Sequence, residues 1–256
     1  MEEWLNQNRA RLFIGRQYFH HHALEILNAH SVLKNTFCDA LNGDIPIAPR
    51  LKSTKGIESK GIKAEELNVA LRTLLRNRIN TDIKFEVVEE YGVFYFSSEK
   101  SSIGGFDFAL LNHQKNLLAL RNLCYGELVY NDGIKRWNTF LAKNEDLRKI
   151  ATGLVKDDEI GKNISLETDL LNMPLVVGEI QFGNWALAYR DFFKVLKANV
   201  QNSIDCLIYI VPTGNLESLL SDGIVTFEKT ERILKEFSKV ISVPVWLVGI
   251  DIDEGN

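Results

Sequence analysis

The chain has 256 residues, 45% of them hydrophobic and 25% charged, a globular composition with enough apolar residues to bury a substantial core. This composition excludes disorder as the main state. The formal net charge of −4 argues against a protein that binds nucleic acid through overall positive charge, because such proteins are generally basic.

The N-terminal sequence and the cysteines indicate the cellular compartment. The start, MEEWLNQNRARLF, lacks the basic and apolar segments of an export signal, and the strongest apolar run, residues 207–211, is too short to span a bilayer. Cys38, Cys124 and Cys206 are widely spaced and form no Cys-x-x-Cys pair, so they suggest neither disulfides nor a zinc site. We expect a soluble cytoplasmic protein.

The first two thirds of the chain mix helical and strand-like segments. Residues 23–41 and 64–77 place apolar side chains at helical spacing, so we expect the first third to be mostly helical. Residues 85–96 are rich in β-branched and aromatic residues and favour a strand or hairpin, and residues 112–123 and 137–150 resemble helices. Since no repeat or linker is visible, we treat residues 1–256 as one domain.

Residues 49–80 are rich in basic residues, with eight lysines and arginines and only three glutamates. This excess is compatible with a local surface for a polyanion. It is equally compatible with a solvated loop followed by an ordinary surface helix.

From residue 166 onward, short apolar runs alternate with amphipathic helices, the pattern of a mixed α/β sheet. Strands are expected at residues 175–182, 206–211 and 243–250, and helices at residues 185–197 and 223–240. Ser221 and Asp222 are a candidate N-cap for the second helix. The first helix has an apolar stripe wider than one core contact requires, which suits packing against a second subunit.

The strand sequence VVGEIQF carries the candidate chemistry. Side chains alternate along a strand, so Glu179 and Gln181 share one face while Gly178, Ile180 and Phe182 share the other. Burying a carboxylate is costly without a partner, and a hard divalent cation is one suitable partner. Asp169, before a predicted turn at residues 172–174, can return a second carboxylate to the same place. The layout is that of an Asp…Glu-x-(Lys/Gln) metal nuclease site.

Phosphodiester hydrolysis needs an in-line water and relief of charge at the phosphate, which bound Mg²⁺ supplies. We expect Asp169 to be a direct ligand, Glu179 to hold the metal or a metal-bound water, and Gln181 to orient the attacking water; Ile180 is counted as a further metal ligand. Many such nucleases have lysine at the position of Gln181, and a neutral amide contributes no positive charge. Taken alone, this spacing also fits ordinary polar residues at a strand end.

A longer stretch has a family resemblance. The run from residue 178 to 251 contains GEIQFGN, an apolar helix, a strand with a polar turn, the pair Phe227-Glu228 and the closing VPVWLVGID. This run, together with YFHHHALEIL at residues 18–27, resembles the BglII/BstYI family of type II restriction endonucleases. The resemblance implies an α/β restriction-endonuclease-like fold of the PD-(D/E)xK type, a mixed sheet flanked by helices with a helical N-terminal part. Residues 85–162 have no counterpart and are expected to be a family-specific insertion.

The resemblance also implies site residues. Asp169 stands one residue further from Glu179 than the family pattern, which leaves Glu167 as its alternative. Asn184 falls where the family directs a side chain toward DNA bases, and asparagine can pair with adenine, although a helix cap explains it equally well. The list of DNA-contacting candidates is completed by Ser221 and Asp222 in a second loop and by His20, which contacts phosphate or supports the carboxylates.

These features predict a homodimeric, Mg²⁺-dependent endonuclease of a restriction-modification system that cuts both strands of a short palindromic site in double-stranded DNA, with GATC as a candidate core. No nucleotide-binding loop occurs, so ATP is not expected. One alternative is another nuclease of this fold, for repair or modified DNA. The other is a catalytically inactive DNA-binding protein, suggested by Gln181 in place of lysine.

Overall fold

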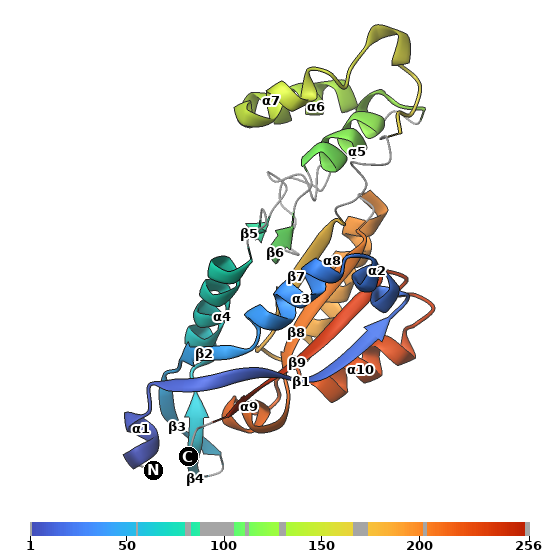
Figure 1. The fold of residues 1–256 in the computed structure, drawn as a ribbon. Helices are drawn as coiled ribbons and strands as arrows, with labels where there is room; N and C mark the ends of the chain where they lie inside the picture. The colour runs from blue at the N-terminus through green and yellow to red at the C-terminus, as the bar shows by residue number, and fades with distance from the viewer. Residues whose placement is uncertain are drawn as a thin grey trace.

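The structure, a computed structural model, describes residues 2–54, 56–79, 83–87, 105–110, 113–127, 132–165, 174–201 and 204–253. In this part of the chain, seven strands form one mixed sheet and two further strands form a hairpin (Figure 1). The strands of the sheet are, in spatial order, β2 (Gly43–Pro46), β1 (Arg9–His20), β9 (Val245–Asp253), β8 (Cys206–Pro212), β7 (Val176–Ile180), β6 (Phe106–Leu110) and β5 (Ile83–Val87). The hairpin consists of β3 (Pro49–Thr54) and β4 (Ile57–Ile62).

The three central strands β7, β8 and β9 are parallel, and antiparallel strands β6 and β1 flank them. Parallel neighbours need a crossover connection, and helices supply it here. The helix α8 (Leu187–Gln201) joins β7 to β8, and α9 (Gly214–Leu219) and α10 (Phe227–Glu236) lie between β8 and β9. These three strands confirm the strands expected in the last third of the chain.

Both faces of the sheet are covered, as β8 illustrates. Ile208 and Ile210 pack in one hydrophobic cluster with α2 (Ala23–Ala29), α3 (Ser31–Ala40) and α4 (Ala64–Arg78), whereas Leu207 and Tyr209 pack in a second cluster with α8 and α10. A strand buried on both sides is apolar throughout rather than alternating, which explains the continuous run that made β8 recognisable.

The first third contains the expected helices α2, α3 and α4, and a short N-terminal helix α1 (Glu2–Asn6). It also contains four strands that the apolar spacing did not predict. The longest of them, β1, pairs along most of its length with β9, and its register shifts between Ile14 and Arg16. Several exposed polar side chains on β1 and this irregularity hide the period-two pattern in the sequence.

The N-cap predicted for α10 was wrong. Thr226 caps this helix, because its side chain accepts a hydrogen bond of 3.4 Å from the backbone N–H of Lys229. Ser221 and Asp222 instead lie in the preceding loop, before Gly223, whose φ of 75° is in the left-handed region.

A group of helices, α5 (His113–Tyr125), α6 (Gly133–Lys143), α7 (Glu145–Ala151) and the 3₁₀ turn η2 (Asp157–Glu159), follows β6 and has a small hydrophobic core of its own. Figure 1 shows α5, α6 and α7, coloured green to yellow, beyond the part of the sheet that holds β5 and β6. The fully buried Arg121 donates hydrogen bonds to the carbonyls of Leu154, Glu159 and Lys162 and so fixes the segment after α7. The single helix predicted over residues 137–150 is divided at Asn144.

Strands β5 and β6 belong to the main sheet, so the helical group begins only after β6. That residues 85–162 are a family-specific insertion stays a prediction. No helix in the described ranges is both long and apolar enough to cross a membrane.

Candidate active site

The polar pair of strand β7 lies at the centre of the sheet. Glu179 is the fourth residue of β7 and Gln181 follows the strand directly, and both are almost fully buried, with exposures of 3% and 8%. Their side chains contact the same helix, α8: Glu179 pairs with Lys194 and Gln181 bonds to Asp191. The predicted common face of the two residues is therefore confirmed.

The opposite side of the strand carries Gly178. A Cβ atom built on Gly178 would lie 2.0 Å from Cζ of Phe108, so the aromatic ring of the neighbouring strand occupies the space of a side chain. This close approach fixes β6 against β7 at the level of the polar pair.

The amide of Gln181 is held at both ends. Its Nε2 donates a 2.9 Å hydrogen bond to Oδ2 of Asp191, and its Oε1 accepts a 2.9 Å bond from the backbone N–H of Gly183. A carboxylate only accepts and an N–H only donates, so these two partners determine which way the amide faces. The same Oδ2 accepts a bond of 3.0 Å from the Tyr209 hydroxyl, which makes fully buried Asp191 the fixed point of this network.

A second carboxylate, Asp107, comes from strand β6. The register pairs Phe108 with Gly178, which places Asp107 beside the end of β7. Its Oδ2 accepts a 2.7 Å hydrogen bond from the backbone N–H of Ile180, and its Oδ1 accepts one of 2.6 Å from Arg72 on α4. Asp107 thus lies next to the strand segment that carries Glu179.

Burial raises the pKa of Glu179 from 4.5 to about 8. The nearby Lys194 ammonium opposes this shift, and the negative charges of Asp107 and Asp191 add to it. Nζ of Lys194 lies 2.5 Å from Oε1 of Glu179, yet this oxygen accepts no hydrogen bond of good geometry from the residues that the structure describes. A buried carboxylate with other carboxylates nearby and an unsatisfied oxygen is an environment that a divalent cation would stabilise.

The donor set fits a hard cation. Glu179 and Asp107 offer carboxylate oxygens, and Ile180 offers its carbonyl, to which the Asn68 amide donates a long hydrogen bond of 3.4 Å. Mg²⁺ typically takes one or two carboxylates and keeps several waters, so a set this small is sufficient. The described residues contain no cluster of three or more histidine, cysteine or acidic side chains arranged for a metal.

The comparison with protein families decides the identity of the fold. The model of the family described as restriction endonuclease BglII/BglIII matches residues 16–250. The chain belongs to this family. It is accordingly a type II restriction endonuclease, as the resemblance of residues 18–27 and 178–251 implied.

Solved structures give a weaker likeness. One similar structure is that of restriction endonuclease BglII complexed with a DNA 16-mer, with 13% sequence identity and a TM-score of 0.49. The match covers 91% of the present chain and 74% of the BglII chain. Free BglII is 12% identical, with coverages of 91% and 77% and a TM-score of 0.41. No curated protein matches the chain.

Two predicted site residues of this family member, Asp169 and its alternative Glu167, fall in residues 166–173 and so lie outside the described residues. Sequence reasoning missed Asp107, Asp191 and Lys194. A signal existed for each: Asp107 interrupts the short apolar run FDFAL, and Asp191 and Lys194 are three residues apart on the helix that follows strand β7.

The two predicted DNA-facing loops lie side by side. An isolated antiparallel bridge joins Asn184 to Ile224, and the backbone N–H of Val225 donates a 2.8 Å bond to the carbonyl of Gly183. Asn184, Ser221 and Asp222 are all exposed. The Asn184 Oδ1 accepts the backbone N–H of Ala186 at 2.9 Å, a local cap-like bond that occupies part of the amide.

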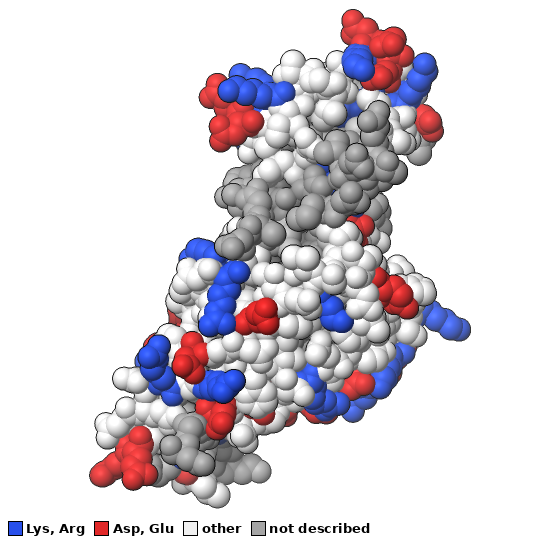
Figure 2. Space-filling model, in the orientation of Figure 1, with Lys and Arg blue, Asp and Glu red and all other residues white. Residues whose placement is uncertain are grey.

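The basic hairpin β3–β4 supports the second loop. Lys52 donates hydrogen bonds of 2.6 and 2.9 Å to the carbonyls of Ser218 and Leu220, and Arg50 donates one of 2.9 Å to Ser221 Oγ. On the face drawn in Figure 2, basic and acidic side chains are interspersed rather than gathered in one basic patch. At least part of the basic excess in residues 49–80 therefore has a structural role.

His20 is buried, with 4% exposure, at the end of β1. Its Nε2 lies 2.8 Å from the carbonyl of Ile241, so this nitrogen carries the proton, and burial lowers the pKa of the imidazole. His21 and His22 follow with left-handed φ values of 44° and 59°. A contact between His20 and DNA stays a prediction.

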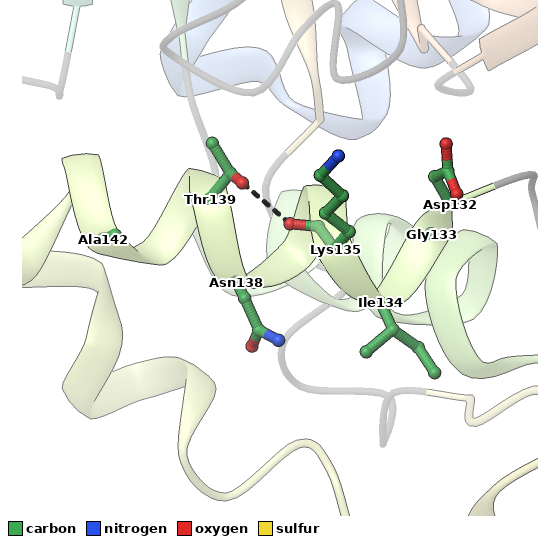
Figure 3. A pocket seen from close by; sticks show the side chains of 7 residues that line it. All are labelled: Asp132, Gly133, Ile134, Lys135, Asn138, Thr139 and Ala142. Atoms are coloured by element: carbon green, nitrogen blue, oxygen red, sulfur yellow. Dashed lines mark hydrogen bonds between the residues drawn. The ribbon is translucent and has the colours of Figure 1, made fainter.

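A shallow depression runs along helix α6 and is drawn in Figure 3. Its lining comes from one helix and the residue before it, and the hydrogen bond drawn there, of 2.8 Å from Thr139 Oγ1 to the Lys135 carbonyl, is internal to that helix. Among the described residues, its lining brings together side chains of α6 and Asp132 alone, and we assign no role to it.

Proposed function

We propose that this protein is a Mg²⁺-dependent endonuclease that cuts both strands of a short palindromic DNA site, with GATC as the candidate core, within a cytoplasmic restriction-modification system. The observation that supports this proposal most is that Glu179 and Gln181 are buried against α8 at the end of β7, where the carboxylate of Asp107 accepts the Ile180 N–H between them. The proposal includes no nucleotide cofactor.

Mg²⁺ would be held by Glu179, the Ile180 carbonyl and a second carboxylate. Asp107 is the second carboxylate that the described geometry favours, and Asp169 is the one that the sequence pattern favours. When bound, the metal supplies a polarised phosphate oxygen and an activated water.

The remaining work falls to side chains of the chain. Each Gln181 amide atom uses only part of its capacity, since Nε2 has two hydrogens and Oε1 two lone pairs. Gln181 can therefore orient a water molecule while Asp191 and Gly183 hold its amide plane. Glu179 can hold that water or the metal, because a carboxylate has two oxygens with two lone pairs each and the one described polar contact is that of Oε1 with Lys194.

We further propose that Asn184, Ser221 and Asp222 contact bases and that His20 acts at a phosphate or supports the carboxylates. The adjacency of the two exposed loops supports a common DNA surface for the first three. A homodimer matches a palindromic site, and large exposed aromatic side chains on and before α8, with Trp185 at 45% and Phe193 at 67% exposure, support a partner surface.

The test is cleavage of unmodified genomic DNA with Mg²⁺ and with a chelator, followed by sequencing of the product ends. One recurring palindrome at the ends is the expected result. Ends without a common site would instead favour a repair or modified-DNA nuclease. Specific DNA binding without any metal-dependent cutting would favour the alternative of a catalytically inactive DNA-binding protein. The neutral Gln181 in place of lysine is the reason to test this alternative.

A further inference from the structure

A buried lysine from helix α8 lies at the centre of the carboxylate cluster. The side chain of Lys194 is 2% exposed, and its Nζ lies 2.5 Å from Oε1 of Glu179 and 3.7 Å from Oδ1 of Asp191. It also donates a 2.8 Å hydrogen bond to the carbonyl of Gly105 and lies 5.1 Å from the ring centroid of Phe106. A buried ammonium on α8 is thus directed at the carboxylate of Glu179, which comes from β7.

Stability alone does not account for this arrangement. Burying an ion pair costs most of the Coulomb energy that it gains, and an apolar side chain of similar volume often serves a core equally well. Asp191 already accepts hydrogen bonds from Gln181 and Tyr209, so it does not depend on Lys194 for a donor. Glu179 is the one carboxylate in the described cluster whose closest polar contact is this lysine.

The charge at position 181 gives the arrangement a function. Gln181 is neutral, so β7 supplies no positively charged side chain to the site. The proposed substrate is an anionic phosphodiester. Gln181 and Lys194 reach the same carboxylate, Asp191, at 2.9 Å and 3.7 Å. The two side chains therefore end in the same small volume although they come from different elements.

We propose that Lys194 is a positioning residue for DNA cleavage: it holds the Glu179 carboxylate in place and supplies from α8 the positive charge that Gln181 lacks. This inference rests on the proposed endonuclease function. It goes beyond that function because it assigns a role to a residue outside the strand motif.

The main experiment exchanges the position of the charge. Lys194→Met keeps the length and the apolar stem, and we expect kcat for cleavage at saturating Mg²⁺ to fall about 100-fold, with KM for DNA within about threefold of wild type, in line with the loss of one preorganised electrostatic group. The double variant Lys194→Met with Gln181→Lys should regain at least about tenfold of the lost rate. A purely structural lysine would not be replaced by a charge on another element.

Two further measurements separate the possibilities. Lys194→Gln removes the charge but keeps a donor for the Gly105 carbonyl, so it tests the charge even if Lys194→Met does not fold; the same loss of kcat is expected. The rise in melting temperature on adding Mg²⁺ without DNA should persist in Lys194→Gln, because the proposed ligands remain. Lys235→Met, which removes an exposed lysine of α10, is the matched control and should cut normally.

If the wild type cuts DNA and Lys194→Gln cuts it at the same rate or faster, the inference is overturned. The ammonium would then be dispensable for cleavage or would compete with the metal. Absence of rescue in a folded double variant would also overturn it. Absence of any metal-dependent cutting by the wild type would instead refute the proposed function itself, so the two failures are distinguishable.

Discussion

The carboxylate of Asp107 accepts a 2.7 Å hydrogen bond from the backbone N–H of Ile180, which links β6 to the residue between Glu179 and Gln181. The other oxygen of Asp107 is paired with Arg72. Asp107 is thus fixed by two elements at the position that we propose for the second metal carboxylate.

Replacing this carboxylate by an amide should stop the chemistry. We expect Asp107→Asn to reduce Mg²⁺-dependent cleavage by about 100-fold or more, because a neutral amide is a poor ligand for a hard cation. Specific DNA binding, measured by gel shift in chelator, should remain within a few-fold of wild type. Asp169→Asn is the paired variant: normal cutting by Asp107→Asn together with loss in Asp169→Asn would assign the second carboxylate to Asp169.

Removal of the central carboxylate should separate cleavage from binding. We expect Glu179→Ala to abolish cleavage while leaving specific binding largely intact, because the lost group serves chemistry rather than phosphate affinity. Gel shift and cleavage of the same labelled fragment measure the two effects. Glu179→Gln, which keeps the volume beside Lys194, controls for the cavity; equal loss of binding and cleavage in both variants would point to a structural Glu179.

The contact between β6 and β7 also makes a prediction about stability. Gly178→Ala should lower the free energy of unfolding by about 1–3 kcal/mol, because the added methyl group overlaps the Phe108 ring and the core must be displaced. Urea denaturation measures the change. Gly153→Ala is the matched control, since a Cβ there has no atom within 4 Å. Phe108→Leu in the Gly178→Ala background should recover part of the loss, and no recovery would mean that the strain lies elsewhere.

Local pattern was sufficient for part of the fold and the site. The parallel strands β7 to β9 are buried on both faces, so their sequences are mostly apolar and were predicted from the chain alone. Glu179 and Gln181 followed from alternation along one strand. In contrast, strand β1 escaped prediction because its pairing with β9 is made by residues far apart in the sequence.

The missed site residues depend on tertiary contacts. Asp107 reaches the site only through the pairing of β6 with β7, and no local spacing specifies that register. Lys194 stands on an amphipathic helix, where a lysine is ordinarily a surface residue; its burial follows from the packing of α8 over the sheet. Asp107 and Lys194, which bring further charge next to Glu179, are therefore residues that sequence periodicity does not place.

The buried His20 should make the protein sensitive to acid. Burial lowers its pKa below the ordinary 6.5, so the unfolded chain binds a proton at a pH where the folded chain does not, and the stability held above pH 6.5 is lost as the pH falls toward the folded pKa. Wild type should therefore lose more stability between pH 7 and pH 5 than His20→Gln, whose amide can still donate to the Ile241 carbonyl. Urea midpoints at each pH measure the difference, and His22→Gln, at an exposed histidine, should behave as wild type. If the urea midpoints of wild type and His20→Gln change with pH in parallel, the pKa of His20 is not lowered by folding. His20 could then carry the positive charge that a phosphate contact requires.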